Sequence, residues 1–511
     1  MEDNSIMSET DGSVENARAI PLSFRDSWKP LDNIRTLLFF VVKQKLDEGI
    51  LQKTLEELIR EHLPILGARI HAARKTGQLE YHIPATFDKD YELFRWSRAS
   101  VKKTFQEANI LKPNDAVEEQ NSITSYPSIV ELEAAWTPSS WPLERKQEEN
   151  DCPLLLVHLT HYEDATVVAT NLPHLVADQA GYATIIESWI NLIRGKSLPP
   201  FFKIPQGVLE GANMAQTELC RSKGEYRVQT KWEIIRVQFG FIPEIVKQRQ
   251  EERRIMLFSG SLVEKLRNDM NEQIAKRNGP DTVVLTSNDI LAAILLKLSN
   301  LHRKSPKMVT LSGAVDIRGR HTDLPKSERY IHNALAFSTA RFPVCRDTPL
   351  MDIAVQNRRA VNRATTQAGI DCSLAVMKEM HRSGKSMHIC EPFEISYATT
   401  NWSGAWANID FSPASKVRMG KTEQGSSSST TVNLSDATTL GEKAASNDRC
   451  VSCEPTLVFG HALGRDIFVL RYNSQIMCKT KEGFWVDFAS SVKNMRLIDS
   501  LLKQNPLLEG I

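Results

Sequence analysis

The stretch Asn171-Leu-Pro-His-Leu-Val-Ala-Asp-Gln-Ala-Gly181 lies between an expected strand and an expected helix, and it indicates the fold more strongly than any other segment. The apolar run at residues 166–172 predicts the strand. Apolar side chains at helical spacing predict a helix over residues 180–195. A histidine between two such elements is held rigidly and can still face a cavity. His174 is therefore a candidate general base, since proton transfer requires hydrogen-bond reach and a pKa near neutrality.

A histidine four residues before an aspartate is a weak signal by itself. The chain has 12 histidines, so such a pair arises by chance about once in one or two chains of this kind. The alternative interpretation is a histidine without a catalytic role at an ordinary turn between a strand and a helix. Other segments must therefore decide between the two.

The composition is typical of a large globular protein. The chain has 511 residues, of which 41% are hydrophobic and 24% charged, and this length predicts about two to four domains. The net charge of +1 argues against nucleic acid or an anionic membrane as the main partner. No apolar run approaches the ~18 residues of a membrane span, and the N-terminus is acidic and rich in serine, unlike a signal peptide. We expect a cytoplasmic protein.

The eight cysteines do not predict a disulfide framework or a metal site. Only Cys450 and Cys453 lie close together, and a zinc site would need a second pair at suitable spacing. Scattered cysteines in a large chain are typical of reduced thiols in the cytosol. We expect no bound metal.

Strands and helices alternate in both halves of the chain, which predicts an α/β or mixed α+β protein with two lobes. The proline-rich residues 199–205 end the first lobe, and residues 206–250 are expected to be a connector. The predicted order is therefore a disordered leader (1–17), a first lobe (18–205), the connector, and a second lobe (251–511). Low apolar content predicts a flexible insertion at residues 419–448.

Three local predictions follow from periodicity and composition. Residues 100–150 are polar and are expected to be irregular. Residues 457–461 and 466–472 are expected to form a late hairpin, and residues 485–501 a closing helix.

Five segments, in order along nearly the whole chain, resemble the acyl-CoA-dependent acyltransferases known as BAHD, which belong to the chloramphenicol acetyltransferase-like superfamily. A single match would mean little, but five in order favour membership. The matching segments are Leu63-Pro-Ile-Leu-Gly-Ala-Arg69, His174 to Asp178, Thr286-Ser-Asn-Asp-Ile-Leu-Ala-Ala293, Val315-Asp-Ile-Arg318 with Leu324-Pro325 and Tyr330-Ile-His-Asn333, and Thr400-Asn-Trp402 with Asp410-Phe411.

The chain departs from the family pattern at three places. Gln179 follows the signature aspartate, where the family has glycine, and Gly181 comes two residues later. His332 replaces another glycine, and the segment after Asp410-Phe411 loses the usual Gly-Trp-Gly. This looser pattern resembles the fungal secondary-metabolite branch. The departures put local loop shape in doubt more than the chemistry.

The resemblance implies two lobes, each a mixed sheet flanked by helices, with the active-site channel between them. His174 would deprotonate the acceptor, and no covalent acyl-enzyme would form because a thioester is already activated. Thr400 and Trp402 would donate hydrogen bonds to the oxyanion. By family position, Asp178 pairs with Arg318 rather than with the base, and Asp410 supports the site from a distance.

The resemblance also implies the substrates. We expect acyl-CoA, with acetyl-CoA preferred, as co-substrate, no permanently bound cofactor, and a monomer. The expected acceptor is a hydroxyl, in preference to an amine, of a small secondary metabolite. For CoA, the resemblance suggests residues at two helix starts, where free N–H groups can bind phosphate: Ser259, Lys265, Thr286 and Ser287.

Two other functions stay open. Peptide-synthetase condensation domains share the superfamily but have a second histidine where this chain has Pro173. A non-catalytic binding protein on the same scaffold is conceivable because of the altered segment after Asp410, although His174, Asp178 and Arg318 are all present. A nucleotide-dependent enzyme is disfavoured because neither common glycine-rich phosphate loop occurs.

Overall fold

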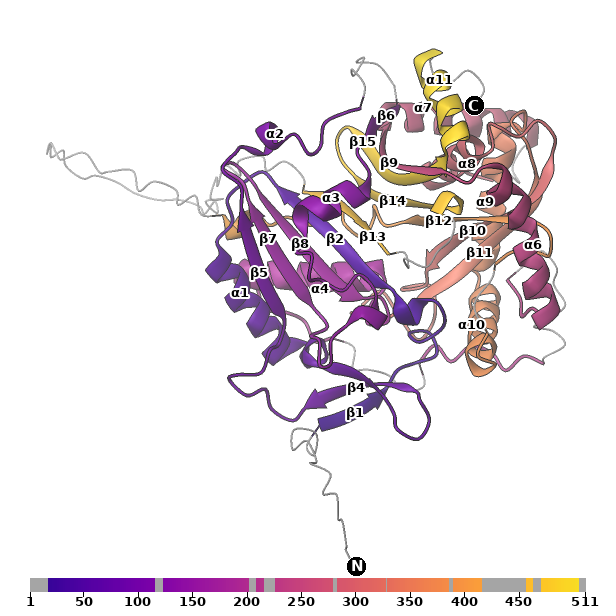
Figure 1. Ribbon diagram of the computed structural model, residues 1–511. Coiled ribbons are helices and arrows are strands. Elements are labelled where there is room, and N and C mark those ends of the chain that lie inside the picture. Colours follow the sequence, from indigo (N-terminus) through magenta and orange to yellow (C-terminus); the bar gives the residue numbers. More distant parts are fainter. Residues whose placement is uncertain are drawn as a thin grey trace, which may run out of the picture.

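The computed structural model contains three β-sheets flanked by helices (Figure 1). It describes residues 17–114, 123–201, 208–215, 226–278, 283–327, 329–385, 389–415, 456–462 and 470–504. The predicted leader lies outside these residues except for Ala17, which begins β1 (Ala17–Pro21). The predicted insertion at 419–448 also lies outside them.

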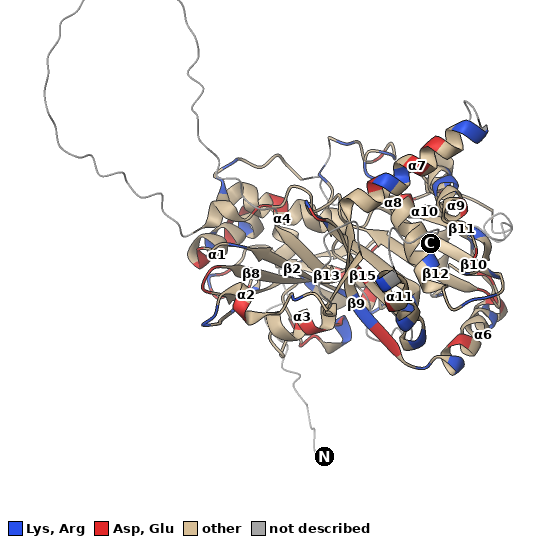
Figure 2. Ribbon diagram, turned by 90° about the horizontal axis from the view of Figure 1, so that it is seen from above, with Lys and Arg blue, Asp and Glu red and all other residues tan. Residues whose placement is uncertain are grey.

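The first lobe is built on a five-stranded mixed sheet in the order β13-β2-β8-β7-β5. At its centre, β2 and β8 are buried along their whole length, because the sheet is covered on both faces. Helices α1 and α4 cover one face and α3 the other (Figures 1 and 2). The strands and helices are β2 (Arg35–Val42), β5 (Arg95–Ser100), β7 (Leu156–His161), β8 (Thr166–Pro173), β13 (Leu457–His461), α1 (Glu48–Glu57), α3 (Ile129–Trp136) and α4 (Gln179–Ile193).

The second lobe is built on a seven-stranded mixed sheet in the order β11-β10-β12-β14-β15-β9-β6. Helices α7, α8, α9 and α10 lie on one face, and α6 and α11 lie on the other (Figure 2). The strands are β6 (Ile123–Tyr126), β9 (Glu251–Ser259), β10 (Lys307–Asp316), β11 (Leu335–Val344), β12 (Ile395–Asn401), β14 (Asn473–Lys479) and β15 (Gly483–Ser491). The helices are α6 (Lys231–Lys247), α7 (Gly260–Asn278), α8 (Ser287–Ser299), α9 (Leu350–Ala364), α10 (Gln367–Arg382) and α11 (Val492–Gln504).

A small third sheet, in the order β1-β4-β3, lies beside the first lobe (Figure 1). Its strands β3 (Arg69–Ala72) and β4 (Leu79–Pro84) form an antiparallel hairpin. A short helix, α2 (Phe105–Ala108), follows β5. None of the described helices is long and apolar enough to cross a membrane.

Each large sheet takes one strand from the other half of the chain. β13 pairs with β2 of the first lobe. Of the segment predicted to form a hairpin with it, residues 470–472 are a 3-10 helix, and residues 466–469 lie outside the described residues. β6 pairs with β9 of the second lobe. This exchange ties the lobes together and holds the surfaces between them in a defined geometry.

Two local predictions are wrong. Residues 483–491 form strand β15, whose residues are all buried between β14 and β9, and the closing helix begins only at Val492. A short run that is apolar on both faces fits a buried strand as well as a buried helix, so its periodicity is ambiguous. Residues 100–150 are not irregular throughout, since α3 begins with a capping box formed by Ser128 and Glu131.

Candidate active site

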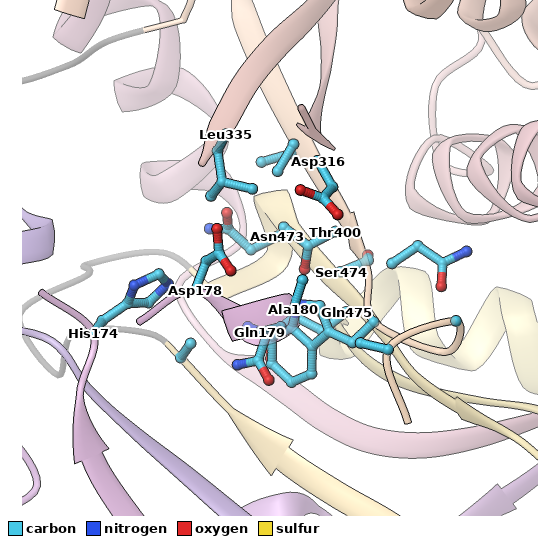
Figure 3. A pocket seen from close by; sticks show the side chains of 17 residues that line it. His174, Asp178, Gln179, Ala180, Asp316, Leu335, Thr400, Asn473, Ser474 and Gln475 are labelled. Carbon is cyan, nitrogen blue, oxygen red and sulfur yellow. The ribbon is translucent and has the colours of Figure 1, made fainter. Parts of the chain in front are cut away.

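A cavity of about 410 Å³ lies between the two lobes and contains His174 at its wall (Figure 3). The first lobe contributes the end of β8 and the start of α4. The second lobe contributes the ends of β10 and β12, the start of β14, and the turn after β12. The lining residues are His174, Asp178, Gln179, Ala180, Ala314, Asp316, Leu335, Ala398, Thr400, Asn401, Trp402, Gly404, Ala405, Ala462, Asn473, Ser474 and Gln475.

His174 directly follows β8, and its backbone is anchored to both lobes. Its N–H donates to the Ile34 carbonyl at 2.9 Å, and its carbonyl accepts from Nδ2 of Asn333 at 2.9 Å. Burial lowers the pKa of the imidazole below its ordinary value of 6.5. Nδ1 is buried without a hydrogen-bond partner among the described residues. The ring is therefore neutral at pH 7 and able to accept a proton.

Asp178 is not hydrogen-bonded to the base. Its carboxylate caps α4 by accepting from the Gly181 N–H at 2.8 Å, and it also accepts from the Ala334 N–H at 2.8 Å. Nη2 and Nη1 of Arg318 lie 2.9 and 3.1 Å from its two oxygens. The pairing of Asp178 with Arg318 that the resemblance implies is thus present, and it joins α4 to the second lobe.

Residues 332–334 hold the loop between His174 and α4 from the other side. Besides its bond to His174, Asn333 donates to Oδ1 of Asp26 from both its backbone N–H and Nδ2, at 3.1 and 2.8 Å. The ring of His332 is hydrogen-bonded to the Val176 carbonyl at 3.0 Å through Nδ1. The His332 side chain thus occupies space that a glycine would leave empty.

The position of glycine after the signature aspartate has a steric reason. A Cβ on Gly181 would lie 1.7 Å from the Ile331 carbonyl oxygen, so a side chain there would push the two lobes apart. Gln179, in contrast, has room for its side chain along the pocket wall. The chain therefore needs its glycine two residues later than the family pattern has it.

Thr400 and Trp402 line the pocket on the side of the second lobe, at and beyond the end of β12. The Thr400 hydroxyl is buried and has no hydrogen-bond partner among the described residues. It is therefore available to a bound molecule. The backbone N–H of Trp402 donates to the Ile476 carbonyl at 2.8 Å, which fixes this turn against β14.

Asp410 does not line the pocket. One of its oxygens lies 3.0 Å from Nη2 of Arg194, just after α4, and the other accepts from the Ser412 N–H at 2.9 Å. These bonds close the segment after β12 onto the first lobe. Asp410 therefore acts on the shape of this region and has no contact with the cavity.

The four residues predicted to bind CoA do not line the cavity either. Ser259 is hydrogen-bonded to Ser261, and Lys265 is exposed on α7. Thr286 caps α8, and Ser287 is the first residue of that helix. The start of α8 nevertheless reaches the cavity wall, because Asn288 accepts a hydrogen bond from Nδ2 of Asn401 at 2.9 Å.

Two glutamines of the pocket were not predicted as site residues. Oε1 of Gln179 and Oε1 of Gln475 are buried without a partner among the described residues. Buried acceptors left unpaired cost free energy that a ligand with hydrogen-bond donors would recover. No local pattern distinguishes a glutamine at such a position, except that Gln179 stands where the family has glycine.

Comparisons with known proteins identify the family of this chain. Residues 140–430, more than half of the chain, match the model of a family described as the Transferase family. The chain is 24% identical over 413 residues to the transcriptional regulator calD of Penicillium decumbens, covering 77% of this chain and 81% of calD. It is 25% identical over 389 residues to the acetyltransferase adrJ of Penicillium rubens, covering 72% of this chain and 76% of adrJ.

Among solved structures, the fold is similar to that of F. graminearum TRI101, crystallised with coenzyme A and T-2 mycotoxin. The TM-score is 0.61 at 12% identity, and the match covers 95% of this chain and 97% of that structure. The predicted two-lobe α/β fold, with a mixed sheet and flanking helices in each lobe, is thereby confirmed.

Proposed function

This chain belongs to the Transferase family, the BAHD-type acyltransferases, and we propose that it moves an acyl group from acyl-CoA to a hydroxyl of a small secondary metabolite. The observation that carries the proposal is the position of His174, a half-buried histidine at the wall of the cavity between the lobes, where burial lowers the pKa of its imidazole. A base in such a cavity can meet two substrates that reach it together, which removes the translational cost of their encounter.

The proposed reaction proceeds in two steps. The imidazole of His174 takes the proton of the acceptor hydroxyl while the hydroxyl oxygen attacks the thioester carbonyl carbon. The tetrahedral oxyanion is stabilised by the Thr400 hydroxyl, which has no other partner among the described residues, and by the Trp402 indole N–H. Collapse of the intermediate expels the CoA thiolate, which receives the proton from His174.

We propose acetyl-CoA as the preferred donor. The name of adrJ and the coenzyme A in the TRI101 crystal support this choice. The start of α8 is the proposed phosphate site, with Thr286 and Ser287, because free N–H groups there attract anions and Asn288 ties the helix to the cavity wall. Ser259 and Lys265 would contribute from the neighbouring start of α7.

A non-catalytic regulator is the second candidate. It is favoured by one observation, the name of the relative calD. A protein that only bound a small molecule would not need a desolvated base opposite an unpaired hydroxyl. Asp178 and Arg318 are paired here and His174 lines the cavity, so we prefer the enzyme.

The test is incubation of the purified protein with a panel of acyl-CoAs and metabolite extracts from its source. We expect free CoA thiol to be released only when both substrates are present, and an acceptor mass increase equal to one acyl group. Acetyl-CoA should give the highest kcat/KM. Ligand-dependent binding without thiol release from any acyl-CoA would favour the regulator instead.

Gln179 is expected to help select the acceptor. Gln179→Gly removes an amide from the pocket wall and enlarges the cavity, so KM for the acceptor should rise about fivefold or more while KM for acyl-CoA stays within about twofold. The matched control is Gln367→Gly, because Gln367 is likewise the first residue of a helix but is exposed on α10. Equal effects of the two variants on acceptor KM would show that Gln179 acts only through its helix.

A further inference from the structure

Helix α6 carries a continuous apolar stripe on its outer face. Five side chains at spacings of three and four residues are 45–70% exposed: Trp232, Ile235, Phe239, Ile242 and Val246. Figures 1 and 2 both place α6 at the periphery of the second lobe, and it falls within the predicted connector at 206–250. Large apolar side chains scattered singly on a surface are ordinary, but a contiguous stripe of this kind marks an interaction site.

The fold does not require this stripe, because the opposite face of α6 holds the helix in place. Val237 and Gly240 are buried, and a Cβ on Gly240 would lie 2.2 Å from the Glu394 carbonyl oxygen. The ring of Phe241 packs edge-on against Tyr472 at 5.0 Å, and Glu244 pairs with Arg303 at 3.0 Å. The outer face therefore remains unexplained by the packing of the second lobe.

The charges beside the stripe have one sign. Lys231, Arg236 and Lys247 are exposed on α6. The two acidic residues of the helix are engaged with the body of the protein, Glu233 with Arg227 at 2.7 Å and Glu244 with Arg303. The outer face of α6 is thus apolar and cationic, although the net charge of the whole chain is only +1.

We propose that α6 docks the protein onto a bilayer that contains anionic lipids. A helix with tryptophan and phenylalanine on its apolar face and lysine or arginine beside it lies in the interfacial plane, with the apolar side chains at the acyl boundary. The 17 residues of α6 span about 25 Å, long enough for the five side chains to enter together. The cations would meet the lipid headgroups.

Charge argues against a second copy of this chain as the occupant. Stripes with this heptad-like spacing can pair between helices. A two-fold antiparallel pairing of α6 would place Lys231 of one copy beside Lys247 of the other, and the outer face offers no carboxylate to offset the repulsion. A bilayer with anionic lipids offers an acyl boundary to the apolar stripe and negative headgroups to the cations.

The test is flotation of the full-length protein with vesicles of phosphatidylcholine alone or of phosphatidylcholine with phosphatidylserine at a 3:1 ratio, roughly a 25% anionic surface. We expect binding to the mixed vesicles and little to phosphatidylcholine alone. The triple variant Trp232→Ser, Phe239→Ser, Ile242→Ser should lower the partition coefficient at least ~30-fold. The matched control replaces three exposed apolar residues elsewhere by serine, Ile50, Val284 and Leu497, and should bind like the wild type.

A second variant keeps the stripe and reverses the charge: Lys231→Glu, Arg236→Glu, Lys247→Glu. It should lower binding to the mixed vesicles at least about tenfold, because each cation contributes attraction near the surface. Wild-type protein that stays unbound at about 1 mM mixed lipid, or serine variants that bind as the wild type does, would overturn the proposal. A dimer that forms without lipid and that the serine substitutions dissociate would also overturn the proposal, since it would identify a second copy as the occupant.

Discussion

Replacing His174 by alanine should lower kcat for acyl transfer by about 10²–10⁴-fold while the protein stays folded. The reason is that the neutral imidazole is the one base we assign to the acceptor proton, and burial keeps the pKa of the imidazole below 6.5. Both anchors of this residue use its backbone, the bonds to Ile34 and Asn333. Removal of the side chain therefore leaves the loop tied, and circular dichroism should be unchanged.

The control is His158→Ala. His158 is likewise a histidine whose pKa is lowered by burial, but it lies on β7 beside Ser97 and does not line the cavity. Its variant should keep wild-type turnover. In the wild type, kcat/KM should fall only at a pH below 6.5, because protonation of His174 removes the base and burial lowers the pKa of its imidazole. Turnover above about a tenth of wild type in a folded His174→Ala variant would contradict the assignment.

The elements around His174 were predictable because their patterns are local. An apolar strand run and a helical periodicity meet within 30 residues, and the structure has β8 and α4 there. The exchange of β13 and β6 was not predictable. β13 pairs with residues more than 400 positions earlier, and periodicity records which faces are apolar but not which strand is the neighbour. The prediction placed β13 in the second lobe because it relied on position along the chain, whereas β13 pairs with β2 of the first lobe.

The same distinction applies to the site. The cavity brings together His174, Asp178, Thr400 and Trp402, which were all placed by motifs. Asp410 and the four residues suggested for CoA do not line the cavity. Their motifs indicate a helix start or a turn, but they do not indicate which surface that element faces. The tie from Asp26 through Asn333 to the His174 carbonyl was missed, because three segments converge there that are far apart in sequence. Nothing near Asp26 signals such a contact.

Breaking the Asp178–Arg318 pair should destabilise the protein, and replacing Arg318 should cost more stability than replacing Asp178. Arg318→Met leaves two neighbouring carboxylates without their cation, because Nη1 of Arg318 also binds Asp316 at 2.8 Å. We expect about 3–5 kcal/mol lost from the free energy of unfolding. Asp178→Asn should cost less, since Arg318 keeps Asp316 and the amide oxygen can still accept from one backbone N–H. Denaturant unfolding of each variant gives these values directly.

The double variant decides whether the pair itself carries the effect. With both charges of the pair removed, only Asp316, whose side chain is 46% exposed, is left without its cation. The loss should therefore be smaller than the sum of the two single losses by at least ~1 kcal/mol. Strict additivity would mean that the two side chains do not act on each other, despite contacts at 2.9 and 3.1 Å. The variant that loses more stability should also lose more activity. In each variant kcat should fall, while KM for acyl-CoA should change less. The carboxylate positions the loop that carries His174 and the start of α4, whereas the proposed CoA residues lie on α7 and α8.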